Sequence, residues 1–157
     1  MSLAGRPAGK EDLDRLGRLV TSWASSERDT NEMVLAVDSL ESPSGVRWFI
    51  RLAGEEKQVT TVWLHLRERT LHVETQFMPH PEENVEELYE LLLRLNARFS
   101  LLRFVIGDED AVFLAGEVPL AAVDEDVLDT LVGTAWHYTE QWFRPCMRIG
   151  YRSKFRG

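Results

Sequence analysis

The sequence predicts an α+β fold, a two-layer sandwich in which helices cover one face of a five-stranded antiparallel sheet. Apolar residues recur at every second position between residues 46 and 78 and again between residues 102 and 119. Segments with apolar residues at every third or fourth position lie before, between and after these two clusters. The expected order is therefore helix, three strands, helix, two strands, helix (α-β-β-β-α-β-β-α).

The first helix is expected over residues 11–26, where one apolar stripe is formed by Leu13, Leu16, Val20 and Trp23. Residues 1–10 are small or polar and contain two glycines and a proline, so they predict a disordered lead-in. Residues 30–41 fit either a short helix or a strand. Residues 41–45, "ESPSG", predict a loop.

A hairpin is expected between residues 59–66 and 70–78, joined by "RERT" and preceded by a strand that begins at residue 46. Pairing Leu66 with Leu71 gives this hairpin one mostly apolar face. The opposite face then pairs His65 with His72 and Trp63 with Glu74. Such a division is typical of an antiparallel sheet that is covered on one side.

A second helix is expected from residue 85, with Asn84 as its N-cap and Glu87 completing a capping box. A further hairpin turns at "GDEDA". If Ile106 faces Val112, then Val105 and Phe113 lie opposite each other on the uncovered face.

The last helix is expected to begin after Asp124 and to end at Pro145. Residues 11–145 then form a single domain, and residues 146–157 form a basic C-terminal tail. The bases at this end of the chain are Arg144, just before the tail, and Arg148, Arg152, Lys154 and Arg156 within it. The tail is expected either to fray in solvent or to dock on an acidic surface, its own or a partner's.

Composition excludes several classes of function. The 157-residue chain has 26 acidic against 18 basic residues and a formal charge of −8, which argues against nucleic-acid binding. No apolar run is long enough to span a membrane. Cys146 is the only cysteine and cannot form an internal disulfide, so a cytoplasmic location is expected.

Motifs for chemistry are sparse. His65 and His72, with Glu74 diagonal to His72, are weak metal-ligand candidates, but the strong zinc spacings are absent, so neither a metal nor a cofactor is expected. Cys146 lies near arginines that could lower its pKa, but the sequence shows no base to activate it. No nucleophile or phosphate-binding motif occurs, and we expect no enzyme activity.

Four apolar residues are candidate contacts. Trp63, on an otherwise polar face, either anchors a partner or stacks against Arg47 or Arg51. Met78 is a second candidate for partner binding. Val105 and Phe113 need cover, from a second copy of the chain or from the chain's own terminal segments.

The element order, together with "EEKQVTTVWLHLRERTLHVETQFMP", "ELYELLLRLNARF" and "DAVFLAGEVPLAAVDED", resembles the YbjN family in its actinobacterial branch. That family is similar in fold to type III secretion chaperones. The resemblance implies a small cytoplasmic homodimer, a regulator or a chaperone, that binds segments of other proteins. It supplies no catalytic motif. The alternative hypothesis is a ligand- or metal-sensing regulatory domain that uses the His65/His72 face.

Overall fold

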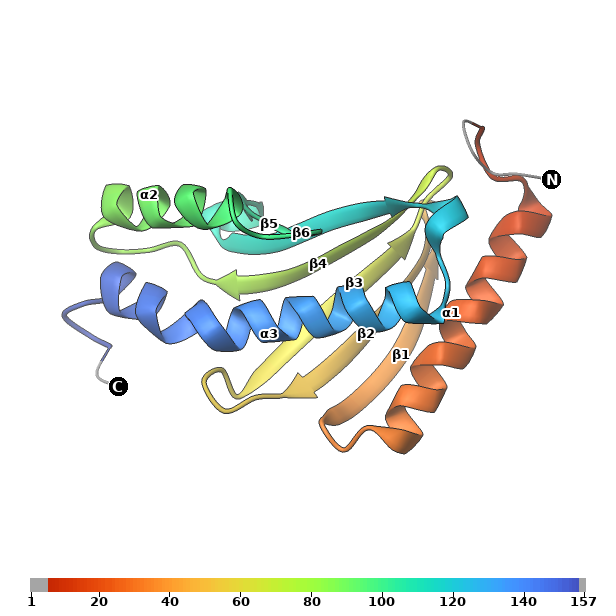
Figure 1. Ribbon diagram of the computed structural model, residues 1–157, viewed down its shortest axis with the longest axis horizontal. Helices are drawn as coiled ribbons and strands as arrows, with labels where there is room; N and C mark the ends of the chain where they lie inside the picture. The colour runs from red at the N-terminus through yellow and green to blue at the C-terminus, as the bar shows by residue number, and fades with distance from the viewer. Residues whose placement is uncertain (1–5, 156–157) are drawn as a thin grey trace.

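The computed structural model describes residues 6–155, which form three helices packed against a six-stranded antiparallel sheet (Figure 1). The strands lie in the order β1-β2-β3-β4-β6-β5. In chain order the elements are α1 (Lys10–Thr30), β1 (Val34–Ser42), β2 (Gly45–Ala53), β3 (Val59–Leu66), β4 (Thr70–Met78), α2 (Val85–Asn96), β5 (Arg103–Ile106), β6 (Val112–Pro119) and α3 (Glu125–Gly150). The α+β class is confirmed.

The sheet has six strands rather than the five expected, because the segment left open between helix and strand is β1. It continues through the expected loop to Ser42 and pairs with β2 along its length, with Val37 opposite Ile50 and Glu41 opposite Val46. Gly45 allows the tight turn between the two strands, because its backbone φ of 121° is one that residues with a side chain rarely adopt. The order is therefore α-β-β-β-β-α-β-β-α.

The register of both predicted hairpins is confirmed. Leu66 lies opposite Leu71 and His65 opposite His72. In the second hairpin, Val105 lies opposite Phe113. Since side chains alternate between the two faces of a strand, this register places the side chains of the paired residues on their expected faces.

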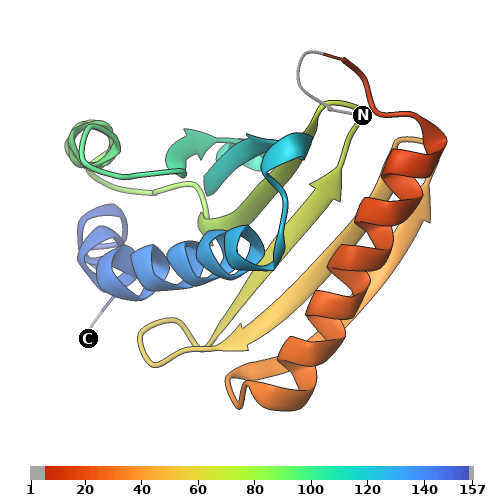
Figure 2. The ribbon, with the colours of Figure 1, turned by 45° about the vertical axis from the view of Figure 1, so that its right-hand side comes forward.

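All three helices pack on the same side of the sheet (Figure 2). Helix α1 crosses β1 and β2, where Trp48 Nε1 donates to Thr21 Oγ1 at 3.0 Å. Helix α3 lies over β3 and β4, and α2 packs against α3 and β5. The two ends of the sheet are therefore flanked by different helices, α1 at β1 and α2 at β5 (Figure 1).

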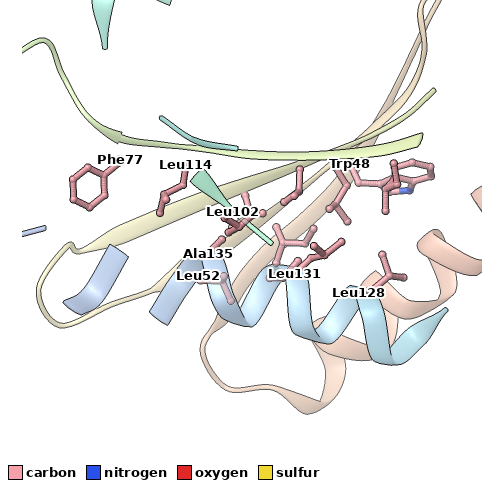
Figure 3. Packing of buried hydrophobic residues seen from close by; sticks show 14 of the residues in the cluster. Trp48, Leu52, Phe77, Leu102, Leu114, Leu128, Leu131 and Ala135 are labelled. Atoms are coloured by element: carbon pink, nitrogen blue, oxygen red, sulfur yellow. The ribbon is translucent and has the colours of Figure 1, made fainter. Parts of the chain in front are cut away.

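The core fills the space between the helices and the sheet (Figure 3). Side chains of β2, β6 and α3 meet there, and the labelled residues Trp48, Leu114 and Leu131 are each at most 2% exposed. The alternation along β3 and β4 sends one set of side chains into this core. The other set faces away from the helices, and the sheet face that carries it is called the open face below.

Helix α3 does not end at Pro145, as the sequence predicted, but continues to Gly150. Burial keeps this last turn in place, because Cys146 is fully buried and Gly150 packs against Pro81 and Met78. Asp124 caps the helix as predicted, its carboxylate accepting from the Val127 backbone N–H at 2.8 Å. Asn84 is the N-cap residue of α2, as predicted, but its side chain makes no capping hydrogen bond and the expected capping box with Glu87 does not form. The Asn84 backbone is left-handed and its side-chain amide donates instead to the Ile149 carbonyl, tying α2 to the end of α3.

Basic residues after α3 contact the chain's own acidic surface just before α2 and in its first turn. Lys154 Nζ lies 2.6 Å from Glu82 Oε2, and Arg152 lies 3.4 Å from Glu87. The hydrogen bond to Glu82 raises the pKa of Lys154. Of the two expectations for the tail, docking on its own surface is the one observed for residues 151–155, while Arg156 lies outside the described residues.

The predicted disordered lead-in lies partly outside the described residues, which begin at Arg6. The described part makes contacts with the rest of the chain. The Ala8 backbone N–H donates to the Glu68 carbonyl at 2.7 Å, and Arg6 pairs with Asp12 at 3.3 Å.

Candidate functional site

The open face carries a row of large side chains that crosses the sheet from strand to strand. Phe49 of β2 lies beside Trp63 of β3, which lies beside Glu74 of β4. The next row brings Gln76, Phe113 and Val105 together. Sequence reasoning placed Trp63, Phe113 and Val105 on one face, and the register brings them to neighbouring rows.

A hollow of about 540 Å³ occupies this face. Its wall combines aromatic, aliphatic and charged side chains, contributed by Arg47, Lys57, Val59, Thr61, Trp63, Glu74, Gln76, Asp108 and Phe113. Two cations and two carboxylates thus surround two aromatic rings. Mixed linings of this kind suit a polypeptide, which brings polar backbone and apolar side chains together.

Trp63 is half-buried and held in place by its neighbours. The Arg47 guanidinium lies over its ring, 4.5 Å from the centroid, and Phe49 meets it edge-on with centroids 5.5 Å apart. The stacking interpretation is therefore confirmed for Arg47. A tryptophan so fixed loses little conformational freedom when another chain packs on it, so stacking and partner binding are compatible at this position.

Met78 lies apart from this surface. It is 1% exposed and packs beneath the last turn of α3, next to Gly150. The pairing of β4 with β6 shifts between Gln76 and Met78, so Phe77 and Met78 are both buried although they are consecutive. We therefore leave Met78 out of the proposed contact surface.

A second apolar surface lies at the β5 edge of the sheet. A groove of about 250 Å³ runs between α2 and β5 and is lined by Tyr89, Leu92, Leu93, Asn96, Phe104, Val105, Ile106 and Val112. Leu93 is 70% exposed, Ile106 55% and Val105 43%. This set of lining residues is called the α2/β5 patch below.

The backbone of β5 is partly closed to strand addition. The Asn96 side chain accepts from the Phe104 backbone N–H at 2.7 Å and donates to the Phe104 carbonyl at 3.0 Å. An asparagine thus occupies the positions that a neighbouring strand would use. A chain that docks on the α2/β5 patch must therefore rely mainly on side-chain packing.

The opposite edge of the sheet differs. Strand β1 is nine residues long and is the terminal strand of the sheet as described. Leu35 and Leu40 are 54% and 51% exposed. Leu40 pairs with Arg47, and the Arg47 guanidinium lies over the ring of Trp63. The open face therefore extends from Trp63 through Arg47 to Leu40 at this edge of the sheet. A long terminal strand with exposed apolar side chains is a template for adding a further strand.

The histidine pair is formed as predicted but each ring has its own partner. His72 Nε2 lies 3.5 Å from Glu74 Oε2, and His65 Nε2 lies 3.1 Å from the Ser44 carbonyl oxygen. Within residues 6–155, no three His, Cys, Asp or Glu side chains are arranged to hold a metal ion. The metal-sensing hypothesis therefore gains no ligand set from the structure.

Cys146 is fully buried in α3, and burial raises the pKa of its thiol to about 12. The arginines near it in the sequence therefore do not lower its pKa below the usual value.

We expect Cys146 of the native protein to react with a disulfide reagent at pH 8 ~100-fold or more slowly than the same cysteine in the urea-unfolded protein. In the native protein little of the thiol is ionised to the reactive thiolate, and the reagent cannot reach the buried sulfur. Absorbance of the released thiol gives the rate. Comparable rates in the two conditions would contradict this assignment.

Lys57 lies at the rim of the open-face hollow, where its Nζ donates to the carbonyls of Gln76 at 2.6 Å and Phe77 at 3.3 Å. Burial lowers its pKa from 10.5 to about 8. The folded state therefore binds this proton less tightly than the unfolded state does. Below pH 8 the charged amine opposes folding, and this penalty is relieved as the pH rises from about 8 to 10.5.

We accordingly expect the stability of wild type relative to Lys57→Met to increase between pH 8 and pH 10. The difference between the two proteins isolates Lys57, because Cys146 contributes the opposite slope in both: its raised pKa makes stability fall above pH 9. Urea unfolding at several pH values measures the difference. A difference that stays constant over this range would rule out a lowered pKa at Lys57.

Sequence reasoning missed Leu93, Leu40 and the Asn96 contact. Leu93 could have been noticed, because it falls outside the apolar stripe that Leu88, Leu92 and Leu95 form on α2. Leu40 carried no signal, since β1 has no regular alternation.

Comparison with known proteins identifies relatives of this chain. A family model named YbjN, described as a putative bacterial sensory transduction regulator, matches residues 31–147. An uncharacterised protein of Mycobacterium leprae is 30% identical over 115 residues, and one of Mycobacterium tuberculosis is 29% identical over 107. These matches cover 73% and 68% of this chain, but only 62% and 58% of the mycobacterial proteins.

Two solved structures share the fold. One is the heterodimeric ExoU-SpcU complex from the type III secretion system of Pseudomonas aeruginosa, with a TM-score of 0.51, 14% identity, and 80% of this chain and 94% of that chain covered. The other is the HopA1-SchA chaperone-effector complex, with a TM-score of 0.56, 11% identity, and 87% and 98% covered. Within residues 6–155, no helix combines the length and hydrophobicity needed to cross a membrane.

Proposed function

Because the chain belongs to the YbjN family, we propose that it is a non-enzymatic module that binds a segment of another protein, as a homodimer in the bacterial cytoplasm. The role is that of a regulator or chaperone, exerted through binding. The observation that carries the proposal is the open face: a sheet surface free of helices, with an aromatic row, a hollow and a terminal strand at its side.

The bound segment is extended and pairs with the free edge of β1. Backbone hydrogen bonds to the edge supply affinity without requiring a particular sequence. Every second side chain of the segment then points over the open face, toward Leu40, Phe49 and Trp63. The rigid indole of Trp63 provides the anchor.

The fold neighbours support a protein partner for this architecture. Both are complexes of two different proteins, and one is described as a chaperone with its effector. At identities of 14% and 11% they establish the fold alone. The partner is therefore proposed from the open face of this chain, and the neighbours support it in that both are complexes between two proteins.

The α2/β5 patch is proposed as the homodimer interface. A twofold interface must be self-complementary, because the same patch meets itself. This patch offers both halves of such a contact: Leu93 protrudes with 70% of its surface exposed, beside a groove of about 250 Å³. Val105 lies in the patch, and Phe113 borders it from the open face.

Affinity capture tests the protein-binding proposal. Tagged wild type, Trp63→Ala and Leu101→Ala are incubated with native bacterial lysate, and the captured proteins are quantified by mass spectrometry. We expect a protein that is enriched by wild type and by Leu101→Ala, whose exposed leucine lies outside the open face, but lost with Trp63→Ala. Capture of nothing above background, or equal capture by all three proteins, would contradict the proposal.

A further inference from the structure

A cavity of about 320 Å³ lies on the helix-covered side of the sheet, away from the open face. It is formed where α1 and α3 approach each other over β1 and β2 (Figure 2). Its lining comes from all four elements and the α1–β1 connection, namely Trp23, Glu27, Asn31, Met33, Val34, Ile50, Leu52, Asp129, Val132, Gly133 and Trp136. The volume falls at the lower end of the ~300–1,000 Å³ that small-molecule sites occupy.

Two tryptophans and two carboxylates meet in this cavity. Asp129 of α3 accepts a hydrogen bond from Trp23 Nε1 at 2.7 Å, which joins α3 to α1. Glu27 accepts from the Asn31 side chain at 3.2 Å. Neither carboxylate belongs to an ion pair of residues 6–155, and Asp129 is exposed while Glu27 is half-buried.

The floor of the cavity is aliphatic. Ile50 and Leu52 are 0% and 3% exposed, and both project from β2. One wall is left open by Gly133, which lies inside α3, where glycine disfavours the helix relative to alanine. Gly133 is itself exposed, and a Cβ placed on it meets no atom within 4 Å, so the cavity is open to solvent at this residue.

The acidic character continues beyond the cavity. An adjoining hollow shares Met33 and Trp136 with it and adds Glu55, Glu56 and Glu140. Glu140 is held by the backbone N–H groups of Glu55 and Glu56, at 3.2 and 2.7 Å. Glu56 is paired with Arg144, so a cation that approaches from this side is attracted by Glu55 and Glu140.

We propose that this cavity binds a small organic cation, an ammonium group that carries alkyl substituents. Aliphatic floor, indole walls and carboxylates are the surroundings that such an ion requires, because its surface is apolar and its charge is positive. A metal ion would find too few carboxylate ligands. A neutral ligand would bring no positive charge to balance the two carboxylates. The site is separate from the open face and does not depend on the proposed protein binding.

Calorimetric titration with two ligands of the same shape tests this directly. Choline carries the quaternary ammonium, and 3,3-dimethylbutan-1-ol replaces its nitrogen by carbon and has no charge. We expect choline to bind with a Kd of about 1 mM or lower, and the neutral isostere to bind at least ~10-fold more weakly. No binding of choline, or equal binding of both ligands, would overturn the proposal.

Variants locate the site. Asp129→Asn keeps the size of the side chain and an acceptor for Trp23 but removes the charge, and is expected to weaken choline binding by about 10-fold. Gly133→Leu places a large side chain where the cavity opens to solvent and is expected to abolish binding in a protein whose circular dichroism is unchanged. Glu86→Gln, on the exposed side of α2, is the control and retains wild-type affinity.

If Gly133→Leu does not fold, Asp129→Asn decides the question. Choline binding that is unchanged in Asp129→Asn, or weakened equally in Glu86→Gln, would show that the cavity is not the site.

Discussion

Replacing Phe77 with alanine is expected to lower the free energy of unfolding by about 3–5 kcal/mol. Phe77 is 0% exposed, and its ring meets Phe104 of β5 and Phe143 of α3 edge-on, with centroids 4.8 and 6.2 Å away. The truncation leaves a cavity at the junction of three elements, and the sheet and helix cannot both move to fill it. Urea unfolding followed by circular dichroism measures the loss.

Phe113→Ala is the matched control, since it removes the same atoms from the neighbouring strand β6. Phe113 is only half-buried at the open-face hollow, so a smaller loss, about 1–2 kcal/mol, is expected there. If the two variants lose the same stability, Phe77 does not have the central place in the core that the structure gives it.

Val105→Asp is expected to raise the Kd of the proposed homodimer by ~100-fold or more, since a carboxylate at an apolar interface has no partner there. Val105 is 43% exposed in the single chain, so the carboxylate stays hydrated in the monomer and the fold tolerates it. The effect should therefore fall on association and leave unfolding nearly unchanged. Sedimentation velocity over a dilution series gives the Kd.

Leu40→Asp provides the comparison, because Leu40 is similarly exposed, at 51%, but lies on β1 at the other edge of the sheet. It should leave the Kd of the dimer within about threefold. Equal weakening of the dimer by both variants would point to a general loss of association. An unchanged Kd in Val105→Asp would rule out the α2/β5 patch as the interface.

The strand registers could be predicted because period-two alternation and the turn residues specify them together. Pairing Leu66 with Leu71 determined which face the residues from Val62 to Thr75 occupy, and the structure agrees. The same reasoning failed for β1, since a terminal strand with mostly exposed side chains shows no alternation. It also failed for Met78, because the shift in pairing after Gln76 reverses the faces.

Features that depend on how separate elements pack could not be predicted. The helix that continues past Pro145 is held by burial of Cys146, which is a property of the tertiary structure. The α2/β5 patch requires α2 to be placed beside β5. The cavity between α1 and α3 joins Trp23 to Asp129, which are 106 residues apart in the chain.

Light scattering of the wild-type protein, measured as it elutes from a sizing column over a range of concentrations, tests the central claim most directly. The chain has a mass of 18.1 kDa, and the account predicts twice this mass at micromolar concentration, falling to the single-chain value in Val105→Asp. A wild-type protein that has the mass of one chain at every concentration would contradict the proposed homodimer, and the α2/β5 patch would then need another partner.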